Sequence, residues 1–170
     1  MSNELLADAF ERVRDALYPA VSGLSRDELA YRPDPEANSI AWLVWHLTRI
    51  QDDHISGLSG GPQVWTTQGW AERFALPLDP ADTGYGHGPD DVASVTAEAD
   101  LLTGYFEDVH TATQDYLRTL TPSDLVRVVD RRWDPPVTAA VRLVSIIADD
   151  LQHVGQAAYV RGMLPESLNP

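Results

Sequence analysis

Apolar residues recur at helical spacing in four long stretches of the sequence, and each stretch predicts an amphipathic helix. The first runs from residue 3 to about residue 21 and should end near Pro19. Its apolar stripe consists of Leu5, Leu6, Ala9, Phe10, Val13, Ala16 and Leu17. The second runs from residue 40 to about residue 55, with Asn38 or Ser39 as its N-cap. It is apolar on almost every side near its start, which predicts a central position in the fold.

The third and fourth stretches lie in the second half of the chain. The third begins at Asp90 or Asp91 and runs to about Leu120, with a predicted buried set of Val95, Leu101, Leu102, Tyr105, Phe106, Val109, Tyr116 and Leu117. The fourth begins behind Thr138 and closes at Gly162, a residue suited to a left-handed turn at a helix end. Its predicted buried face is Leu143, Ile146, Ile147, Leu151, Val154, Ala158 and Tyr159.

The connections differ in length and composition. Residues 25–28 have the form of a capping box and predict a short helical turn. Residues 56–89 are rich in glycine and proline and predict mostly loop, with one short helix from about Thr67 to Ala75. Residues 125–129 resemble a short strand, but Trp133-Asp-Pro-Pro136 should prevent its continuation into a sheet. The long loop should pack over another part of the protein, because it carries the aromatic residues Trp65, Trp70, Phe74 and Tyr85.

These elements predict an all-α fold, a four-helix bundle with a long, loop-rich connection between its second and third helices. A chain of 170 residues that is 44% hydrophobic is long enough for one sizeable core and short for two. We therefore interpret residues 1–170 as a single domain. Bundles of this kind commonly build metal sites from side chains on facing helices.

Composition narrows the possible partners. A net charge of -14 argues against nucleic acid, which is bound by clusters of Lys and Arg. The absence of cysteine excludes disulfides and thiolate ligands, so a metal site must use nitrogen and oxygen, and a reacting thiol must come from outside. No apolar run approaches the roughly 20 residues of a membrane span, and the start of the chain does not resemble a signal peptide. We expect a cytoplasmic protein without a membrane partner.

One pair of residues on the fourth predicted helix suggests a metal-binding site. Asp149 and His153 are four residues apart, which places both side chains on one face, as two ligands of one metal ion would be. His46, inside the apolar run of the second helix, is the candidate third ligand. Zinc, nickel, manganese or iron(II) would accept two imidazoles and one carboxylate, with a position left open.

Simpler interpretations exist for each of these residues. His46 could be a hydrogen-bonded core residue, and Asp149 with His153 could be an exposed pair of little energetic worth. The Asp149-Asp150 doublet could be a solvated face, and Asp150, three residues before His153, is a competing carboxylate.

The segment Asp149-Asp-Leu-Gln-His-Val-Gly-Gln156, together with His46-Leu47, resembles the DinB-like metal-binding superfamily. It is most similar to the mycothiol-dependent branch, which includes the maleylpyruvate isomerase and mycothiol S-transferase proteins of actinobacteria. The resemblance implies a four-helix bundle with His46, Asp149 and His153 as metal ligands. It also implies mycothiol as a thiol cosubstrate and a homodimer, although nothing in the sequence specifies the dimer face. Many relatives have His or Glu where this chain has Asp149.

Further candidates are weaker. Asp52 lies where relatives are often acidic and could orient a ligand, face the cavity or face solvent, and Gln156 could hydrogen-bond a ligand or substrate or bridge helices. Arg132, Arg142 and Arg161 could hold a cosubstrate or a substrate carboxylate, with surface ion pairs as the alternative. We expect three aromatic residues to fill the core, namely Trp45, Trp133 and Tyr159. No role is assigned to His54, His87 or His110, and His87 is at most a residue at the mouth of the site.

The leading hypothesis is a metal-dependent thiol transferase that joins a low-molecular-weight thiol, mycothiol by resemblance, to an electrophilic small molecule. A second is a metal-dependent hydrolase with Asp150 or Asp52 as the base. A third is a non-catalytic, metal-binding dimeric protein. A wild type without stoichiometric metal, or the same metal content after His153→Ala, would favour the third hypothesis. Cleavage of esters or amides that responds to added zinc would separate the second from the first.

Overall fold

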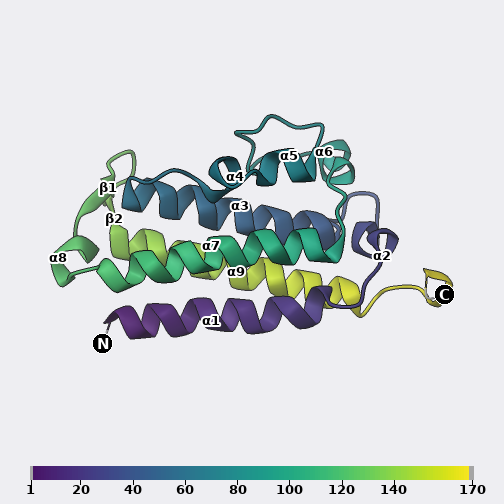
Figure 1. The fold of residues 1–170 in the computed structure, drawn as a ribbon, viewed down its shortest axis with the longest axis horizontal. Helices are drawn as coiled ribbons and strands as arrows, with labels where there is room; N and C mark the ends of the chain where they lie inside the picture. Colours follow the sequence, from purple (N-terminus) through teal and green to yellow (C-terminus); the bar gives the residue numbers. More distant parts are fainter. Residues whose placement is uncertain (1, 169–170) are drawn as a thin grey trace.

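The computed structural model describes residues 2–168. Its long helices are α1 (Ser2–Val21), α3 (Ile40–Ser59), α7 (Ala99–Thr119) and α9 (Ala139–Arg161), and they lie side by side (Figure 1). Each of them packs against two others, α1 and α3 both contacting α7 and α9. The all-α four-helix bundle predicted from the sequence is confirmed.

Short elements fill the connections. They are α2 (Arg26–Ala30), α4 (Val64–Thr67), α5 (Trp70–Phe74), α6 (Pro89–Ser94), α8 (Pro122–Leu125), β1 (Val128–Asp130), β2 (Val137–Thr138) and η1, a 3-10 turn (Glu166–Leu168). In Figure 1, α4, α5 and α6 lie along one side of the bundle, and the β1–β2 hairpin lies at the end opposite α2. The caps predicted at Ser25, Ser39 and Thr138 are confirmed, because each side chain accepts a hydrogen bond from a backbone amide of the helix that follows. The helix start predicted at Asp90 or Asp91 is wrong, since Gly88 is the N-cap of α6.

Helix α3 is the central element, as its all-round apolar start predicted. Residues 40–49 are all buried, and they include polar side chains as well as apolar ones. Buried polar groups need partners inside the protein. Thr48 donates to the Val44 carbonyl oxygen of its own helix, and Gln51 donates to the Thr113 hydroxyl on α7. Helix α3 therefore carries several of the buried polar side chains of the interior.

The third predicted helix is wrong as a continuous element. It is divided into α6 and α7 by the extended residues 95–98, because Val95 and Ala97 turn into the core and the Thr96 hydroxyl accepts a hydrogen bond from Arg26. The short helix predicted from Thr67 to Ala75 is likewise two helices, α4 and α5. Gly69 separates them with a φ of 72°, a left-handed conformation that glycine adopts without strain.

Helix ends and the hairpin correct three further expectations. α1 continues through Pro19 to Val21, and Gly162 is not left-handed but has a φ of -67°. Residues 128–130 do pair with residues 137–138, so the prolines between them lie in the hairpin loop and do not prevent pairing. This correction matters for function, because the hairpin carries Asp130 toward α9.

Several residues predicted to be buried are exposed. The outer face of α9 exposes Leu151, Ala158 and Tyr159, and α1 exposes Leu5 and Ala16. Among the aromatic residues, Trp45, Trp65, Trp70 and Phe74 are buried as expected, while Tyr85, Trp133 and Tyr159 are exposed. Apolar spacing locates a helix, but it does not show how wide a stripe the neighbouring helices cover.

Candidate metal centre

His46 of α3 faces Asp149 and His153 of α9 across the seam between these two helices. Each of the three side chains offers one ligand atom, and these atoms all lie within 4.8 Å of one another. The rings of His46 and His153 are 4.9 Å apart, and the Nε2 atom of His153 is 3.5 Å from Oδ1 of Asp149. The structure thus brings together the three residues that the sequence suggested as ligands.

Hydrogen bonds set the tautomer of both histidines. The Nδ1 atom of His46 is 2.6 Å from the Thr83 carbonyl oxygen, and Nδ1 of His153 is 3.0 Å from Oε1 of Gln156. A carbonyl oxygen can only accept, so each Nδ1 carries the hydrogen and donates it. Both Nε2 atoms therefore keep a free lone pair, which is the arrangement of a metal-binding histidine supported by an outer hydrogen bond.

Asp149 completes a donor set that fits a divalent cation. Its Oδ2 atom is buried and has no hydrogen-bond partner among the described residues. Leaving a buried carboxylate oxygen unpaired is costly, and a cation would remove that cost. Two imidazole nitrogens and one carboxylate oxygen suit zinc, nickel, manganese or iron(II), and three protein ligands leave a position open for another group.

Burial and the contacts among the three side chains shift the pKa values of His46, Asp149 and His153. Burial lowers the pKa of His46, against the opposing effect of its bond to Thr83. Burial would also lower the pKa of His153, but hydrogen bonds with Asp149 and Gln156 outweigh it and raise the pKa. Burial alone would raise the pKa of Asp149, but its hydrogen bond with His153 and the electrostatic effect of the nearby histidines together lower the pKa. When Nε2 of His153 is protonated, it forms an ion pair with Asp149 that a cation must replace.

A segment of the long connection covers His46. Gly84 has a φ of 87°, and a Cβ atom at this position would lie 2.7 Å from Nδ1 of His46 and 3.0 Å from the Trp45 ring. Only glycine fits both the left-handed backbone and this close approach. The covering segment can therefore bring the Thr83 carbonyl against His46.

A second histidine of this segment fastens it to α3. His87 accepts a hydrogen bond at Nδ1 from the Trp42 indole at 3.0 Å, and its Nε2 atom lies 3.0 Å from Oδ2 of Asp82. Trp42 also stacks on the His46 ring, with centroids 4.6 Å apart. The sequence gave His87 at most a place at the mouth of the site, whereas its side chain is buried beside it. The glycines on both sides of His87 were the only sequence signal for so close an approach.

Arg49 and Asp52 hold the long connection from inside the bundle. The Arg49 guanidinium is buried and donates to the Asp82 carbonyl oxygen and to Gln63. Asp52 accepts from the amides of Val64 and Trp65 and from the Tyr105 hydroxyl. The pKa of Asp52 is raised by burial, against the effect of these bonds. Asp52 thus anchors the start of α4 and faces neither solvent nor the metal candidates.

The remaining candidates lie in different places. Asp150 is fully buried and neither of its oxygens has a hydrogen-bond partner in the part of the chain that the structure describes; burial raises its pKa well above the usual value, and it does not belong to the ligand cluster. Gln156 supports His153. Arg161 donates to the Ser22 carbonyl oxygen at 2.8 Å. Arg132 and Arg142 both pair with Asp130 further along the same seam.

The fold and this ligand cluster define a helical bundle with a potential divalent metal site. A family model described as the DinB superfamily matches residues 9–157, and the chain belongs to that superfamily. A search of the curated proteins found no match. Among solved structures, the crystal structure of a conserved protein from Enterococcus faecalis matches with a TM-score of 0.89 and 34% sequence identity, covering 95% of each chain. Neither comparison identifies the mycothiol-dependent branch.

Proposed function

We propose that this protein is a metal-dependent enzyme that transfers a low-molecular-weight thiol, mycothiol or a similar compound, to an electrophilic small molecule. The observation that carries the proposal is that His46, Asp149 and His153 each offer one ligand atom within 4.8 Å of the others, while Nδ1 of both histidines is already hydrogen-bonded to an oxygen acceptor. Zinc is the first choice, with nickel, manganese and iron(II) as alternatives. A bound cation would lower the pKa of a thiol in the open position and hold it as a thiolate at neutral pH.

The residues of the chain would bind and orient the reacting groups. His46, Asp149 and His153 hold the cation, and the Thr83 carbonyl and Gln156 fix the orientation of the two rings. The segment around Gly84 excludes water from the His46 side. In the reaction the thiol proton is released, the thiolate sulfur forms a bond to the electrophilic carbon, and the leaving group takes the displaced electron pair. The chain supplies no cysteine, so the thiol must be a cosubstrate.

The test begins with metal content. We expect protein purified without chelator to contain about one divalent ion per chain, and the His153→Ala variant to contain little. Gln152→Ala is the matched control, because Gln152 precedes His153 on α9 and its amide bonds only its own helix. Equal metal content in wild type and His153→Ala would contradict the site and favour a non-catalytic bundle.

Activity is the second part of the test. The metal-loaded protein is mixed with mycothiol and a panel of electrophiles, and loss of free thiol is followed with time. We expect loss that depends on the metal and is absent in His153→Ala. A metal-dependent cleavage of esters or amides without thiol consumption would instead favour hydrolysis. That alternative is weaker here, because Asp52 and Asp150, its suggested bases, are buried away from the ligand cluster.

Location and assembly stay predictions. Among the described residues, no helix has the length and apolar character needed to cross a membrane. A cytoplasmic location and a homodimer both remain expectations from the sequence. Large apolar side chains exposed on α9 give the first place to test a dimer by light scattering, namely Val141, Val144, Leu151 and Tyr159.

A further inference from the structure

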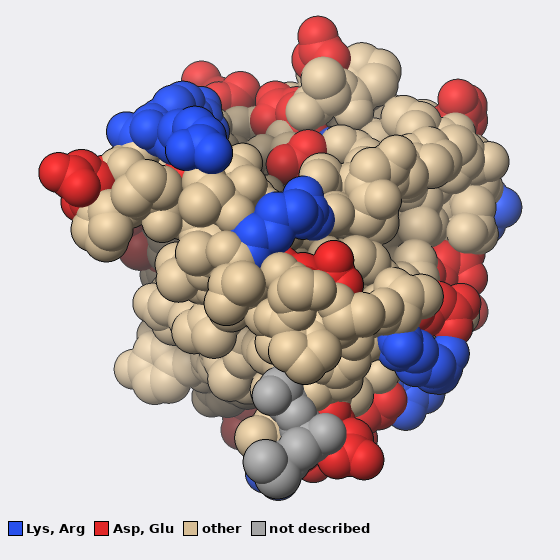
Figure 2. Space-filling view, turned by 90° about the vertical axis from the view of Figure 1, so that its left-hand side faces the viewer, with Lys and Arg blue, Asp and Glu red and all other residues tan. Residues whose placement is uncertain are grey.

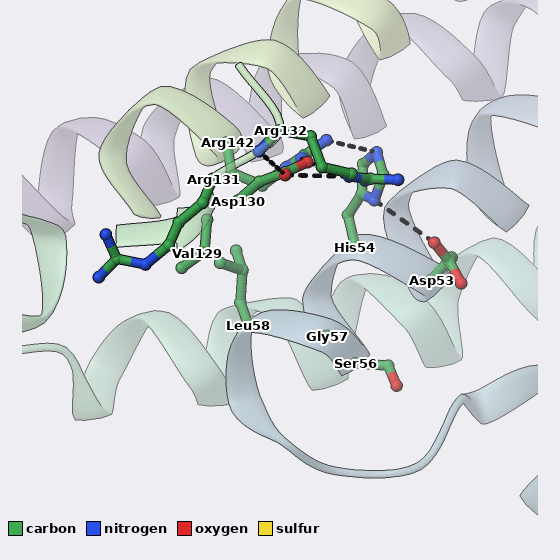
Figure 3. Close-up of a pocket in the computed structure, with 10 residues that line it drawn as sticks. All are labelled: Asp53, His54, Ser56, Gly57, Leu58, Val129, Asp130, Arg131, Arg132 and Arg142. Carbon is green, nitrogen blue, oxygen red and sulfur yellow. Dashed lines mark hydrogen bonds and ion pairs between the residues drawn. The ribbon is translucent and has the colours of Figure 1, made fainter. Parts of the chain in front are cut away.

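A second pocket lies along the same seam, beyond the metal candidates. It has a volume of about 490 Å³ and is formed by the last turns of α3, by β1 with the residues after it, and by the first turn of α9 (Figure 3). Arginines are concentrated here in a chain of net charge -14. Figure 2 shows basic side chains on the end of the molecule that carries the hairpin. Of the 12 basic residues, four fall between residues 127 and 142, namely Arg127, Arg131, Arg132 and Arg142.

Asp130 is the acid at the centre of this pocket, and Arg132 already satisfies it. Asp130 accepts from the Arg132 backbone amide at 2.9 Å and from its Nε and Nη2 atoms at 3.0 and 2.8 Å. These bonds hold the pKa of Asp130 well below its usual range. The hairpin is thereby fixed without needing a second arginine.

Arg142 is held more loosely. Its Nη2 atom is 3.3 Å from Oδ2 of Asp130, and its Nη1 atom is 3.3 Å from Nε2 of His54. A guanidinium has more N–H donors than these two long contacts use. The side chain of Arg142 is 22% exposed, so the remaining donors are accessible from the pocket.

His54, which faces Arg142, contributes no negative charge to the pocket. Because Arg142 can only donate, Nε2 of His54 accepts, and Nδ1 of the same ring faces Asp53 at 3.4 Å. The groups facing Arg142 are therefore the His54 imidazole, Asp53 behind it, and Asp130 shared with Arg132. Arg131 also lines the pocket, and Figure 3 shows its side chain pointing away from the other labelled residues.

The pocket is placed to receive the far end of a molecule bound at the metal candidates. Arg142 precedes Asp149 by two helical turns on the same face of α9, a distance of about 10 Å along the axis. His54 follows His46 by a similar distance on α3. The two sites therefore lie in line along one seam.

We propose that Arg142, with Arg132, binds a carboxylate of the substrate or cosubstrate whose reactive end lies at His46, Asp149 and His153. This inference depends on the proposed function only for the placement of the reactive end at the metal candidates. A planar carboxylate matches the flat fork of a guanidinium. A phosphate is disfavoured, because its additional charge would face Asp53 and Asp130.

The first experiment uses cobalt(II)-loaded protein, in which a thiolate bound to the metal gives a charge-transfer band. A straight-chain thiol that ends in a carboxylate is compared with the thiol of equal length that ends in a primary amide. We expect the acid to bind about tenfold to hundredfold more tightly, the range for a hydrogen bond to a charged group. Equal affinities would overturn the carboxylate site while leaving thiol binding intact.

Variants separate binding from folding. Arg142→Gln should remove the difference between acid and amide, and Arg142→Lys should keep part of it, because lysine retains the charge but loses the fork. Arg131→Gln is the matched control and should keep the whole difference. A loss of equal size in Arg131→Gln would overturn the proposal in favour of general electrostatic attraction.

The second experiment does not depend on the metal or on a thiol. A simple straight-chain carboxylic acid is titrated into the metal-free protein while the Nε–H resonance of Arg142 is followed by NMR, with the corresponding amide and alkyl phosphate as comparisons. We expect only the acid to shift this resonance strongly. An unchanged resonance overturns the carboxylate site, and a larger response to phosphate overturns the choice of carboxylate. If no thiol gives a charge-transfer band, the proposed function fails and this titration alone decides the inference.

Discussion

The two ends of the α3–α9 seam have opposite chemistry although the same pair of helices forms both. At the end near Gly84, the histidines present lone pairs and Asp149 presents an unpaired oxygen, so this end is suited to a cation. At the end near the hairpin, Arg142 and Arg132 present N–H donors around an acid that is already satisfied. The segments that cover each end create the difference, since the Thr83 carbonyl orients His46 and Asp130 orients the arginines.

This comparison shows how a bundle can hold a molecule of mixed character. Parallel rows of side chains on two packed helices offer several positions in line, and each connection selects which chemistry is presented. The following predictions test this difference between the two ends, and they are given from the largest expected effect to the smallest.

Replacing the acid of the metal end should have the largest effect. Asp149→Asn removes the charged donor, and we expect the zinc affinity to fall by at least about 100-fold, beyond the loss caused by changing an outer partner. The neighbouring change Asp150→Asn is the control, because Asp150 is a buried neutral acid outside the cluster. Competition titration with a chromophoric chelator measures both. Similar losses in the two variants would contradict the assignment of Asp149.

Gly84→Ala should disturb the cover of the metal end. The added Cβ would approach Nδ1 of His46 to 2.7 Å in a left-handed backbone. We expect a loss of about 1–3 kcal/mol of folding stability, with zinc affinity about 10-fold to 100-fold lower. Gly86→Ala has a similar φ of 80° but no neighbour within 4 Å, so it should lose stability and keep its zinc affinity. Chemical denaturation and metal titration of both variants separate the effect of the steric contact with His46 from the effect of the left-handed backbone.

Gln156→Leu should loosen His153 without removing a ligand. The variant loses the oxygen that accepts from Nδ1 of His153, and we expect about tenfold weaker zinc binding. Gln152→Leu, one turn away, should bind zinc as the wild type does. Unchanged affinity in Gln156→Leu would mean that the ring is oriented by other contacts.

Zinc affinity should depend on pH through His153. Its pKa is raised above the usual value of about 6.5, so in the metal-free protein zinc must displace a proton from it. Affinity should therefore fall as pH falls below that raised pKa, by about tenfold per pH unit for one proton. His46, whose pKa is lowered, stays neutral in this range. Calorimetry in buffers of different ionisation enthalpy counts the protons released, and no release near neutral pH would contradict the ion pair.

The same shift affects the stability of the metal-free protein. A raised pKa of His153 stabilises the fold fully below about pH 6.5, and this contribution is lost as pH rises through the folded-state pKa. Denaturation at several pH values should show this loss, and His153→Gln should abolish it.

Arg142→Gln should have the smallest effect on the metal end. Removing a positive charge about 10 Å away changes the interaction with a divalent cation by about 0.8 kcal/mol in water, or roughly fourfold in affinity. We expect zinc binding to strengthen slightly, as measured by the same chelator competition. A large change in either direction would show that the two ends are structurally coupled.

Much of the fold could be predicted because helices are specified locally. Apolar spacing located all four long helices, and Ser39 and Thr138 marked two of their starts. The break at residues 95–98 could not be predicted, because only the surrounding core makes it favourable for Val95 and Ala97 to leave helical conformation. The hairpin was missed for a similar reason, since its pairing depends on where α9 begins.

The sequence by itself placed Asp149 and His153 one turn apart on one face of a helix, because a helix has a fixed period. The apolar pattern could not distinguish Asp149 from Asp150, which are neighbours on the helix. In the structure Asp149 lies at the seam, whereas Asp150 lies in the core. Tertiary structure alone decided that His46 meets this pair, that the Thr83 carbonyl fixes the tautomer of His46, and that Asp130 of the hairpin meets Arg142 of α9 at the other end. Contacts between distant elements depend on how whole surfaces pack, and no local period of the sequence records them.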